Sequence, residues 1–408
     1  MKQRRGILEF YVLAAVMVCS IAAAQNSLSL YGYFSTRIEK SFNVPSVSGN
    51  TIVEETGLAE WSTPYFNIMM NHQIDDRAKV FINLNGSKAS TLDVRNYWGE
   101  YMLNKYVTVR LGKIYRKFGL YNEILDAVPT YYGIEPPELF DADHLIVSRT
   151  TTAMLYGSVD VAEGQLNYSA STDNSESGSP IVETPIGYDV NYRFGNGDYT
   201  VGISGYTSGG AAASDVSLGG GSPKSGVLPW MTGDKFSVFG GYGEARISAL
   251  TVQAEYWSAP HTIDRDPAKV VSVITNAGVN AAQRARFLID PAGADIASNV
   301  RVHDTYTVST YYFRAGYSIE TSVGEVGPYV QLDWYKNVET IENKKYGGDE
   351  EAGSADDGQF TKYTAGVVFR PIPQIAAKLD VSSHNYRLNA TDVSYPEARF
   401  DVSYVFGQ

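Results

Sequence analysis

Residues 112–152 read GKIYRKFGLYNEILDAVPTYYGIEPPELFDADHLIVSRTTT and connect two segments in which apolar and polar residues alternate. The connection itself, residues 115–149, has no strand pattern. A loop of this length inside a compact β protein is usually functional or disordered. Tyr, Phe, Leu and Ile are frequent in it, whereas disordered segments are rich in Ser, Gly and Lys. The sequence therefore predicts an ordered loop.

The charges of this loop are distributed unevenly along it. Lys113, Arg116 and Lys117 come first, and the rest of the loop is acidic. An ordered loop that is both acidic and aromatic suits a polar cavity that it narrows. The acidic side chains that we expect to face such a cavity are Glu123, Asp126, Glu135, Glu138, Asp141 and Asp143.

The remainder of the chain alternates with a period of two, which indicates strands with one apolar and one polar face. Leu28, Leu30 and Phe34 share one face of the first such segment. The same alternation recurs at residues 79–85, 188–194, 250–256, 312–319 and 399–406. A half-buried soluble sandwich would show the same pattern, so alternation alone does not identify the fold.

The connection lengths discriminate better between a sandwich and a barrel. Short links occur at residues 74–77, 104–105, 162–164, 195–198, 248–250, 321–324 and 371–374. Their Gly, Asn and Asp residues suit tight turns. Long links occur at residues 39–60, 86–92, 115–149, 172–185, 208–234, 259–303, 339–359 and 385–395.

Short and long links alternate strictly, which predicts about sixteen strands with both termini at the short-turn end. Outer-membrane barrels have an even number of antiparallel strands, short turns at one end and long loops at the other. A sandwich has no reason to sort its loops in this way. The predicted fold is therefore all-β, a transmembrane antiparallel up-and-down β-barrel.

The amino terminus has the pattern of a secretory signal peptide. A basic start precedes an apolar run over residues 10–21 and three alanines, Ala22–Ala24. The apolar run is shorter than the roughly 20 residues that a membrane-spanning helix needs. Cleavage after Ala24 would remove residues 1–24, with the single cysteine Cys19, and leave residues 25–408 as the barrel.

Composition agrees with a secreted barrel. Residues 1–24 hold three of the 33 basic and one of the 45 acidic residues, which leaves 30 and 44 in the remainder. So acidic a chain does not fit a nucleic-acid partner, which requires clustered positive charge. Mean hydropathy is −0.20, yet there are 30 tyrosines. A polar chain can still cross a membrane as a barrel, because only alternate residues meet lipid and aromatic residues line the interfaces.

The chain resembles the sixteen-stranded general porins of bacterial outer membranes along its whole mature length. LYGYF at residues 30–34 is similar to their first strand, and the alternating aromatics that end near Phe406 are similar to their assembly signal, although Gly407 and Gln408 follow here. GKIYRKFGLYN at residues 112–122 resembles, more loosely, the strand exit of phosphate- and dicarboxylate-selective porins.

This resemblance implies a passive diffusion channel for small hydrophilic solutes and ions. It also implies that residues 115–149, the third long loop, fold inward as the constriction. By the same resemblance we expect a homotrimer in the outer membrane, in contact with lipid and lipopolysaccharide.

Strand alternation predicts which charged side chains line the pore. Arg37, Arg110 and Arg314 fall on the inward face, and we place them in the constriction opposite the loop carboxylates. Rings or clusters of charge set the selectivity of such pores. The alternative is that these charges pair along the wall. Other groups placed inward are Lys362, Arg399, Glu100, Glu255, Asp333, Asp380 and Asp401. In residues 235–248 the apolar face switches, so no face is assigned there.

We expect weak cation selectivity. Charges in wide vestibules are screened within about 8–10 Å at ordinary salt, so the constriction decides, and the third loop adds carboxylates there. An alternative is a substrate-selective porin for anions such as phosphate or dicarboxylates.

A distant alternative is a hydrolase built into the barrel. Ser383 and His384 are adjacent, however, and adjacent strand residues point to opposite faces. The five histidines have no metal-site spacing, so we expect no cofactor and no metal. In the external loop 259–303, Asp266–Pro267 predicts the start of a capped helix.

Overall fold

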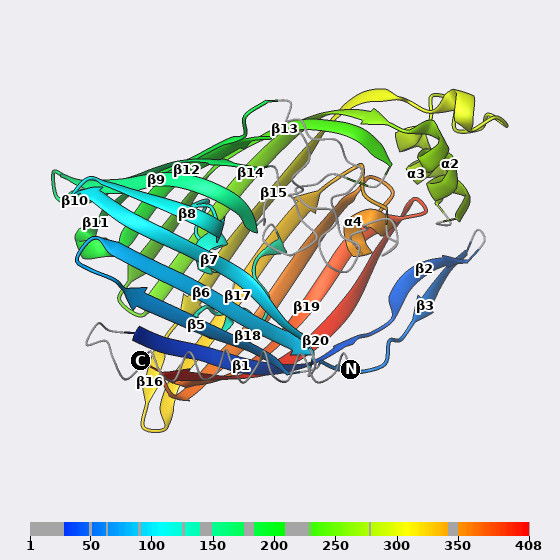
Figure 1. Ribbon diagram of the computed structural model, residues 1–408. Helices are drawn as coiled ribbons and strands as arrows, with labels where there is room; N and C mark the ends of the chain where they lie inside the picture. Colours follow the sequence, from blue (N-terminus) through cyan, green and yellow to red (C-terminus); the bar gives the residue numbers. More distant parts are fainter. Residues whose placement is uncertain are drawn as a thin grey trace, which may run out of the picture.

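The computed structural model describes residues 28–48, 51–62, 64–88, 91–124, 127–138, 149–174, 183–208, 228, 230–276, 279–341 and 350–407. These residues form a closed antiparallel β-barrel with several connections gathered at one end (Figure 1). Among them, no helix combines the length and the apolar character needed to cross a membrane.

The barrel wall consists of sixteen long strands. They are β1 (Leu28–Ser41), β5 (Tyr65–Gln73), β6 (Ala78–Lys88), β7 (Thr91–Asn104), β8 (Val107–Tyr115), β9 (Arg149–Val161), β10 (Gly164–Asp173), β11 (Ile186–Phe194), β12 (Tyr199–Thr207), β13 (Met231–Ile247), β14 (Leu250–Arg265), β15 (His303–Tyr317), β17 (Gly324–Lys336), β18 (Gln359–Ile372), β19 (Ile375–Leu388) and β20 (Thr391–Gly407). Two short pieces, β4 (Glu60–Trp61) and β16 (Ile319–Thr321), precede β5 and follow β15.

Strand β1 closes the barrel. Ile38 lies opposite Phe400 of β20, and Leu30 lies opposite Met70 of β5, so the first strand pairs with both the last and the second long strand. The predicted antiparallel barrel of sixteen strands is confirmed.

The strands place apolar side chains outward and polar ones inward. On β1, Leu30 and Phe34 are exposed on the outer surface, whereas Tyr33 between them is buried inside. Phe34 stacks on Tyr404 of β20 with ring centroids 4.7 Å apart. Such cross-strand aromatic pairs stabilise neighbouring strands. The period-two pattern of the sequence thus corresponds to an apolar outer surface.

Two of the predicted long links are wrong. β19 and β20 are joined by Asn389 and Ala390 alone, both with positive φ, as a two-residue hairpin turn requires. β6 likewise runs to Lys88, and β7 begins at Thr91. The β19–β20 hairpin is extended because Tyr386, Leu388 and Tyr395 are buried at this end.

The external loop predicted at residues 259–303 is shorter, because β14 continues to Arg265 and β15 begins at His303. The connection contains two helices in place of one, α2 (Pro267–Asn276) and α3 (Ala281–Phe287). Asp266 caps α2 by accepting a 2.9 Å hydrogen bond from the amide of Ala268. In α3, Asn280 and Gln283 form a reciprocal capping box.

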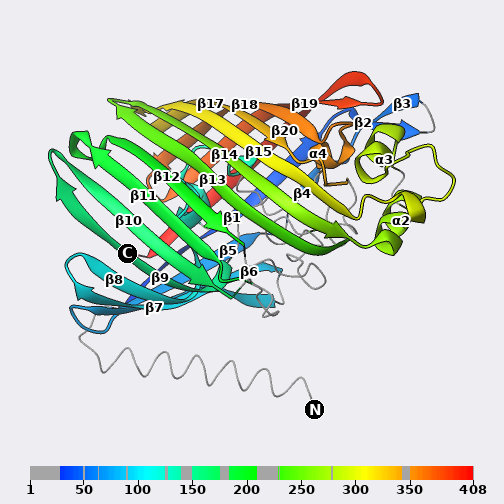
Figure 2. The ribbon, with the colours of Figure 1, turned by 90° about the horizontal axis from the view of Figure 1, so that it is seen from above.

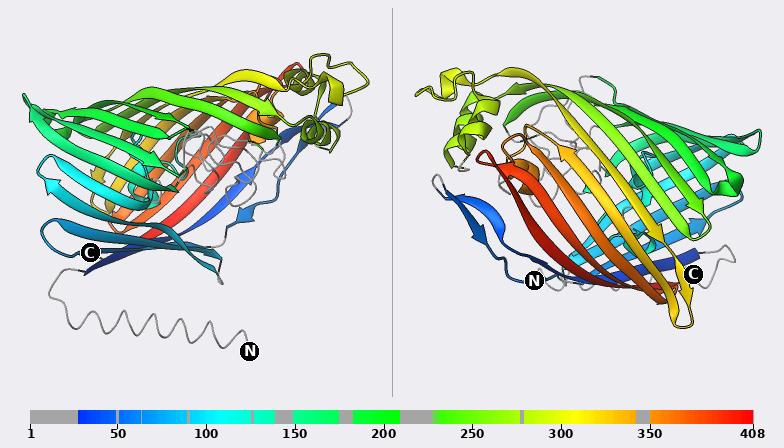
Figure 3. Two further views of the ribbon diagram at one scale, coloured as in Figure 1. Left: turned by 45° about the horizontal axis from the view of Figure 1, so that its top comes forward. Right: turned by 180° about the vertical axis from the view of Figure 1, so that it is seen from behind.

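The other connections carry smaller elements. A hairpin of β2 (Val44–Ser48) and β3 (Thr51–Glu55) follows β1, and α4 (Glu350–Ser354) precedes β18. Two 3₁₀ turns, η1 (Asn122–Ile124) and η2 (Val128–Thr130), lie between β8 and β9, and η4 (Gly195–Gly197) and η7 (Ala297–Asn299) lie elsewhere. Figures 2 and 3 show α2, α3 and the β2–β3 hairpin at the same end of the barrel.

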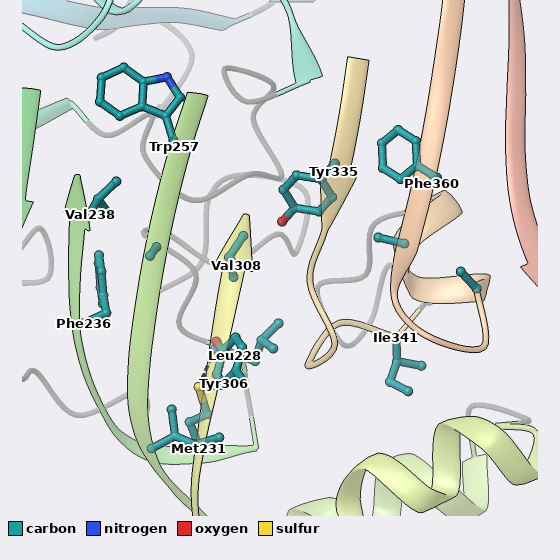
Figure 4. Packing of buried hydrophobic residues seen from close by; sticks show 14 of the residues in the cluster. Leu228, Met231, Phe236, Val238, Trp257, Tyr306, Val308, Tyr335, Ile341 and Phe360 are labelled. Atoms are coloured by element: carbon teal, nitrogen blue, oxygen red, sulfur yellow. Dashed lines mark hydrogen bonds between the residues drawn. The ribbon is translucent and has the colours of Figure 1, made fainter. Parts of the chain in front are cut away.

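An apolar core lies against the inner face of β13–β20 at this end (Figure 4). The strands contribute Phe236, Val238, Trp257, Ile263, Tyr306, Val308, Tyr335, Phe360, Tyr386 and Tyr395, and the connections contribute Leu228, Trp230, Val273, Phe287 and Ile341. This core explains why the apolar face switches along residues 235–248 of β13. Phe236 and Val238 point inward into this core, while Phe239 and Ile247 point outward.

Candidate functional site

The segment between β8 and β9 is bound to the strands at its start. The buried guanidinium of Arg116 donates to Asp173 of β10 at 2.8 Å. The amide of Gly119 donates to Ser204 of β12 at 3.1 Å, and that of Leu120 donates to Glu255 of β14 at 3.0 Å. A Cβ on Gly119 would lie 2.2 Å from the Glu255 carboxylate, and its φ of +59° also favours glycine.

The middle of the segment is anchored by Tyr121. Its hydroxyl donates to Gln253 of β14 at 2.9 Å and accepts a bond from Arg314 of β15. Its ring meets those of Tyr131 and Tyr312 edge to face, with centroids 5.5 and 5.8 Å away. Burial raises the pKa of Tyr121 to about 12, so this hydroxyl stays neutral at physiological pH.

The later part of the segment reaches the remaining strands. Lys378 of β19 donates to the carbonyls of Tyr131 and Gly133 at 2.8 and 2.9 Å. The amide of Glu138 donates to Asp333 of β17 at 3.2 Å. One segment thus contacts strands from β10 round to β19. It can reach so much of a closed wall only from the inside.

One group of charges surrounds Glu135, and we call it the Glu135 cluster. Glu135 lies 2.8 Å from Arg37, 2.6 Å from Arg399 and 3.5 Å from Lys362. The full cluster is Arg37, Glu39, Glu135, Glu138, Glu351, Lys362, His384, Glu397 and Arg399. It joins β1, β18, β19, β20, the segment and α4.

The electrostatics of Glu135 follow from this arrangement. Burial by itself would raise the pKa of Glu135, but the charges of Arg399, Lys362 and Arg37 lower that pKa well below its ordinary value. The carboxylate is therefore held as an anion. Its side chain remains about one-fifth exposed, so it also contacts the interior of the barrel.

A second group lies on β6–β9, and we call it the Arg110 band. The Arg110 guanidinium lies 4.2 Å from the ring centroid of Trp98 and 4.9 Å from that of Tyr156. Arg110 pairs with Glu100 at 2.9 Å and with Glu123 at 3.6 Å. The full band is Lys79, Phe81, Trp98, Glu100, Arg110, Lys117, Glu123 and Tyr156.

Five of the predicted site residues come together in two separate places. Arg37 contacts Glu135 in the Glu135 cluster, and Arg110 contacts Glu123 in the Arg110 band. Strands β5, β6 and β7 separate them along the wall. Glu138 belongs to the first place, where it pairs with Lys362 at 2.5 Å.

The other predicted site residues belong to neither of these two groups. Arg314 is 1% exposed and bonds Gln331 at 2.5 Å as well as Tyr121, so it is sealed under the segment and does not face an open passage. Asp126, Asp141 and Asp143 lie outside the described residues.

Sequence reasoning missed several residues of the site. Trp98 and Tyr156 were not predicted, and Lys378 was not recognised as an anchor. A signal existed for two of them, since Trp98 lies two residues from the inward Glu100 and Lys378 lies two residues from the inward Asp380. Alternation could have placed them inside, but it could not have shown what they contact.

A cavity of about 540 Å³ adjoins the Arg110 band. Lys117, Leu120, Glu123 and Ile124 of the segment line one side of it. The wall side is formed mainly by polar residues of β8–β14, among them Tyr156, Asn167, Asn191, Arg193, Thr200 and Arg246. The described interior therefore contains open polar space next to charged groups.

The geometry offers no catalytic pair at Ser383 and His384. His384 points inward and bonds Glu397 at 3.1 Å, whereas the neighbouring Ser383 lies on the opposite face of β19. Within the described ranges, no group of three or more His, Cys, Asp or Glu residues could hold a metal ion.

Comparison with known proteins identifies the chain. The model of the family described as Gram-negative porin matches residues 12–387. Comparison with curated protein sequences gives no match.

Three solved outer-membrane structures share the fold. The anion-selective porin from Comamonas acidovorans has 12% identity and a TM-score of 0.54, and the match covers 94% of this chain and 100% of that one. The outer membrane channel DcaP of Acinetobacter baumannii has 9% identity and a TM-score of 0.53, with 94% and 98% covered. OmpT of Vibrio cholerae in a trimer form has 11% identity and a TM-score of 0.51, with 94% and 100% covered. The chain belongs to the Gram-negative porin family and is an outer-membrane channel for passive diffusion, not an enzyme.

Proposed function

We propose that residues 115–149 constrict the channel and that small hydrophilic solutes and ions diffuse past them. The observation that supports this most strongly is Glu135, which a segment between β8 and β9 carries to Arg37 of β1 and Arg399 of β20. A loop bound so far from its own strands narrows the open cross-section. It also leaves charged groups on the passage that remains.

The two charged groups differ in sign. The Glu135 cluster has five carboxylates against Arg37, Lys362, Arg399 and one histidine, so it is net negative. The Arg110 band has three cations against Glu100 and Glu123. Opposite charges on separate parts of the wall create a transverse field, which orients dipolar solutes and disfavours lipophilic ones.

Weak cation selectivity is the expected net result. The Glu135 cluster is net negative, and the chain beyond residue 24 is acidic, with 44 acidic and 30 basic residues. The excess positive charge of the Arg110 band supports the alternative, a channel that prefers anions such as phosphate or dicarboxylates. One structural relative is described as an anion-selective porin, although at 12% identity it supports the fold alone.

We also propose that the channel is a homotrimer in contact with outer-membrane lipid and lipopolysaccharide. A trimer form is described for the Vibrio cholerae relative. The exposed apolar residues of β1 and β20, such as Leu30, Phe34 and Phe400, suit either a lipid or a subunit contact.

Solute flux into liposomes tests this function. Purified protein is reconstituted, and swelling is followed in uncharged sugars of increasing size, with the reversal potential measured in a salt gradient. We expect rapid entry of monosaccharides, exclusion of larger oligosaccharides and a small cation-selective potential. A folded, heat-modifiable protein that gives no swelling would contradict the proposal. A clearly anion-selective potential would favour the alternative.

A further inference from the structure

We propose that the Arg110 band is a binding strip for small aromatic carboxylates, at which they pause during passage. The proposal rests on the proposed function, since it requires that solutes pass along the inner face of β6–β9. It adds a ligand class and a location to that function. The argument depends on the order of the side chains in the band, on their exposed edges and on their charges.

The rings and cations of the band form one row across neighbouring strands. Phe81 of β6 stacks on Trp98 of β7 with centroids 5.1 Å apart and planes at 17°. Arg110 of β8 lies between Trp98 and Tyr156 of β9. Two lysines sit near the ends of the row, with Lys79 5.3 Å from the Trp98 ring and Lys117 5.1 Å from the Tyr156 ring.

This order determines which part of each ring a solute meets. The faces of Trp98 are occupied by Phe81 and by cations, and Tyr156 also has cations over its ring. Trp98 and Tyr156 are only partly buried. Since these neighbours lie over the ring faces, we infer that a solute meets mainly the ring edges. Ring edges are electropositive and ring faces are electronegative. A flat aromatic solute can therefore lie with its face on these edges, in the preferred edge-to-face arrangement.

The cations of the band bind the carboxylate end of the solute. Arg110 is already satisfied by Glu100 and Glu123, and the Tyr156 hydroxyl donates to Glu100 at 2.7 Å. Lys79 is only loosely paired, 3.9 Å from Glu100, and its side chain is 29% exposed. Lys117 pairs with Glu123 at 3.0 Å and is 28% exposed. A solute carboxylate can therefore join either lysine without breaking the pairs of Arg110.

The adjoining cavity gives the solute room. Tyr156, Lys117 and Glu123 belong to both the band and the cavity of about 540 Å³, and Leu120 and Ile124 add apolar contact there. An aliphatic carboxylate lacks the ring, and a neutral aromatic alcohol lacks the charge. An aromatic amine carries the same sign as the net charge of the band, in which three cations face two carboxylates. The strip thus distinguishes aromatic carboxylates from each of these solutes.

Block of single-channel current measures the binding. Benzoate is added to the protein in a planar bilayer, with acetate, benzyl alcohol and benzylamine as matched solutes. We expect benzoate alone to reduce the current in a saturable way. Trp98→Leu should weaken the apparent benzoate affinity about fivefold, the factor for one aromatic contact of about average strength. Lys79→Gln with Lys117→Gln should weaken it about two- to fivefold, as for partly exposed ion pairs.

Matched control variants show whether the block depends on the residues of the Arg110 band. Tyr97→Leu removes an aromatic ring that points outward next to Trp98, and Lys269→Gln removes an exposed charge on α2, so both should leave the benzoate block unchanged. If Trp98→Leu does not fold, the lysine double variant gives the test on its own. A normal current that benzoate and acetate affect equally would overturn the strip and leave the channel intact. A folded wild type without current would overturn the channel function and the strip with it.

Discussion

At the scale of the residue, the channel interior shows how a loop is held by side chains that alternation alone places inward. Arg37 and Arg110 lie where the period-two pattern predicted, and each meets a carboxylate of the segment. Arg314 also faces inward, but it is covered by Tyr121 and buried. Alternation predicts which side chains of a strand point inward. It does not report which inward groups a loop covers, because that depends on contacts between residues far apart in sequence.

The charges of the two groups should set ion preference. Glu135→Gln with Glu138→Gln removes two negative charges from the Glu135 cluster and should lower the cation-to-anion permeability ratio. Arg110→Ala removes a positive charge from the Arg110 band and should raise it. Reversal potentials in a salt gradient measure both shifts. Glu320→Gln, an exposed site on β16, serves as the control and should change nothing. Shifts of the opposite sign would show that these groups do not line the ion path.

The pH dependence of Glu135 follows from its lowered pKa. An ordinary glutamate titrates near pH 4.3. Because the pKa of Glu135 is lower in the folded protein, the side chain keeps its negative charge until the pH falls through this folded-state pKa. The ion pairs of Glu135 therefore stabilise the folded state at every pH above the unfolded pKa, and this stabilisation is lost only as the pH falls through the folded pKa. The difference in reversal potential between wild type and Glu135→Gln should therefore stay constant from about pH 7 down to about pH 4. A difference that disappears with a midpoint at or above about pH 4.3 would contradict the ion pairs.

At the scale of the element, the strands were more predictable than their ends. Strict alternation and short links with Gly, Asn or Asp predicted about sixteen strands, since these are local properties of the sequence. The tight turn at Asn389–Ala390 contains no glycine, and a long link over residues 385–395 was predicted in its place. Likewise, Phe236 and Val238 point inward because a core fills that end of the barrel. Such a core cannot be anticipated from a rule that barrel interiors are polar.

The segment between β8 and β9 should depend on Lys378 for its position. Lys378→Met leaves the carbonyls of Tyr131 and Gly133 without this donor inside the barrel. Buried carbonyls that lose a charged donor cost about 1–3 kcal/mol. We expect a lower thermal midpoint in detergent and noisier single-channel currents. Lys269→Met on the exposed face of α2 is the control. Equal midpoints for the two variants would show that the Lys378 contacts do not hold the segment.

At the scale of the whole molecule, the chain is a barrel with an apolar outside, a polar passage and an apolar core at the long-loop end. Its family and outer-membrane location agree with the sequence pattern, because a closed barrel needs only alternate apolar residues to cross lipid. The sequence pattern could not place the core, nor show that the charges form two groups of opposite sign. Both depend on which connections fold back into the barrel.

Removal of the signal peptide also concerns the whole molecule. Removal of residues 1–24 should leave a protein that begins at Gln25 and fractionates with the outer membrane. Amino-terminal sequencing of the protein from purified outer membranes checks this. Retention of residues 1–24 in the membrane-inserted protein would contradict the prediction of a cleaved signal peptide.

The central claim is that residues 115–149 narrow the passage from inside. The most direct test compares single-channel conductance in planar bilayers between wild type and a variant that lacks residues 120–139. The described part of this stretch, residues 120–124 and 127–138, contributes no strand to the wall. The variant should therefore still fold, should remain heat-modifiable and should conduct more current at the same voltage. Equal conductance in a folded, heat-modifiable variant would contradict the claim and place the constriction elsewhere.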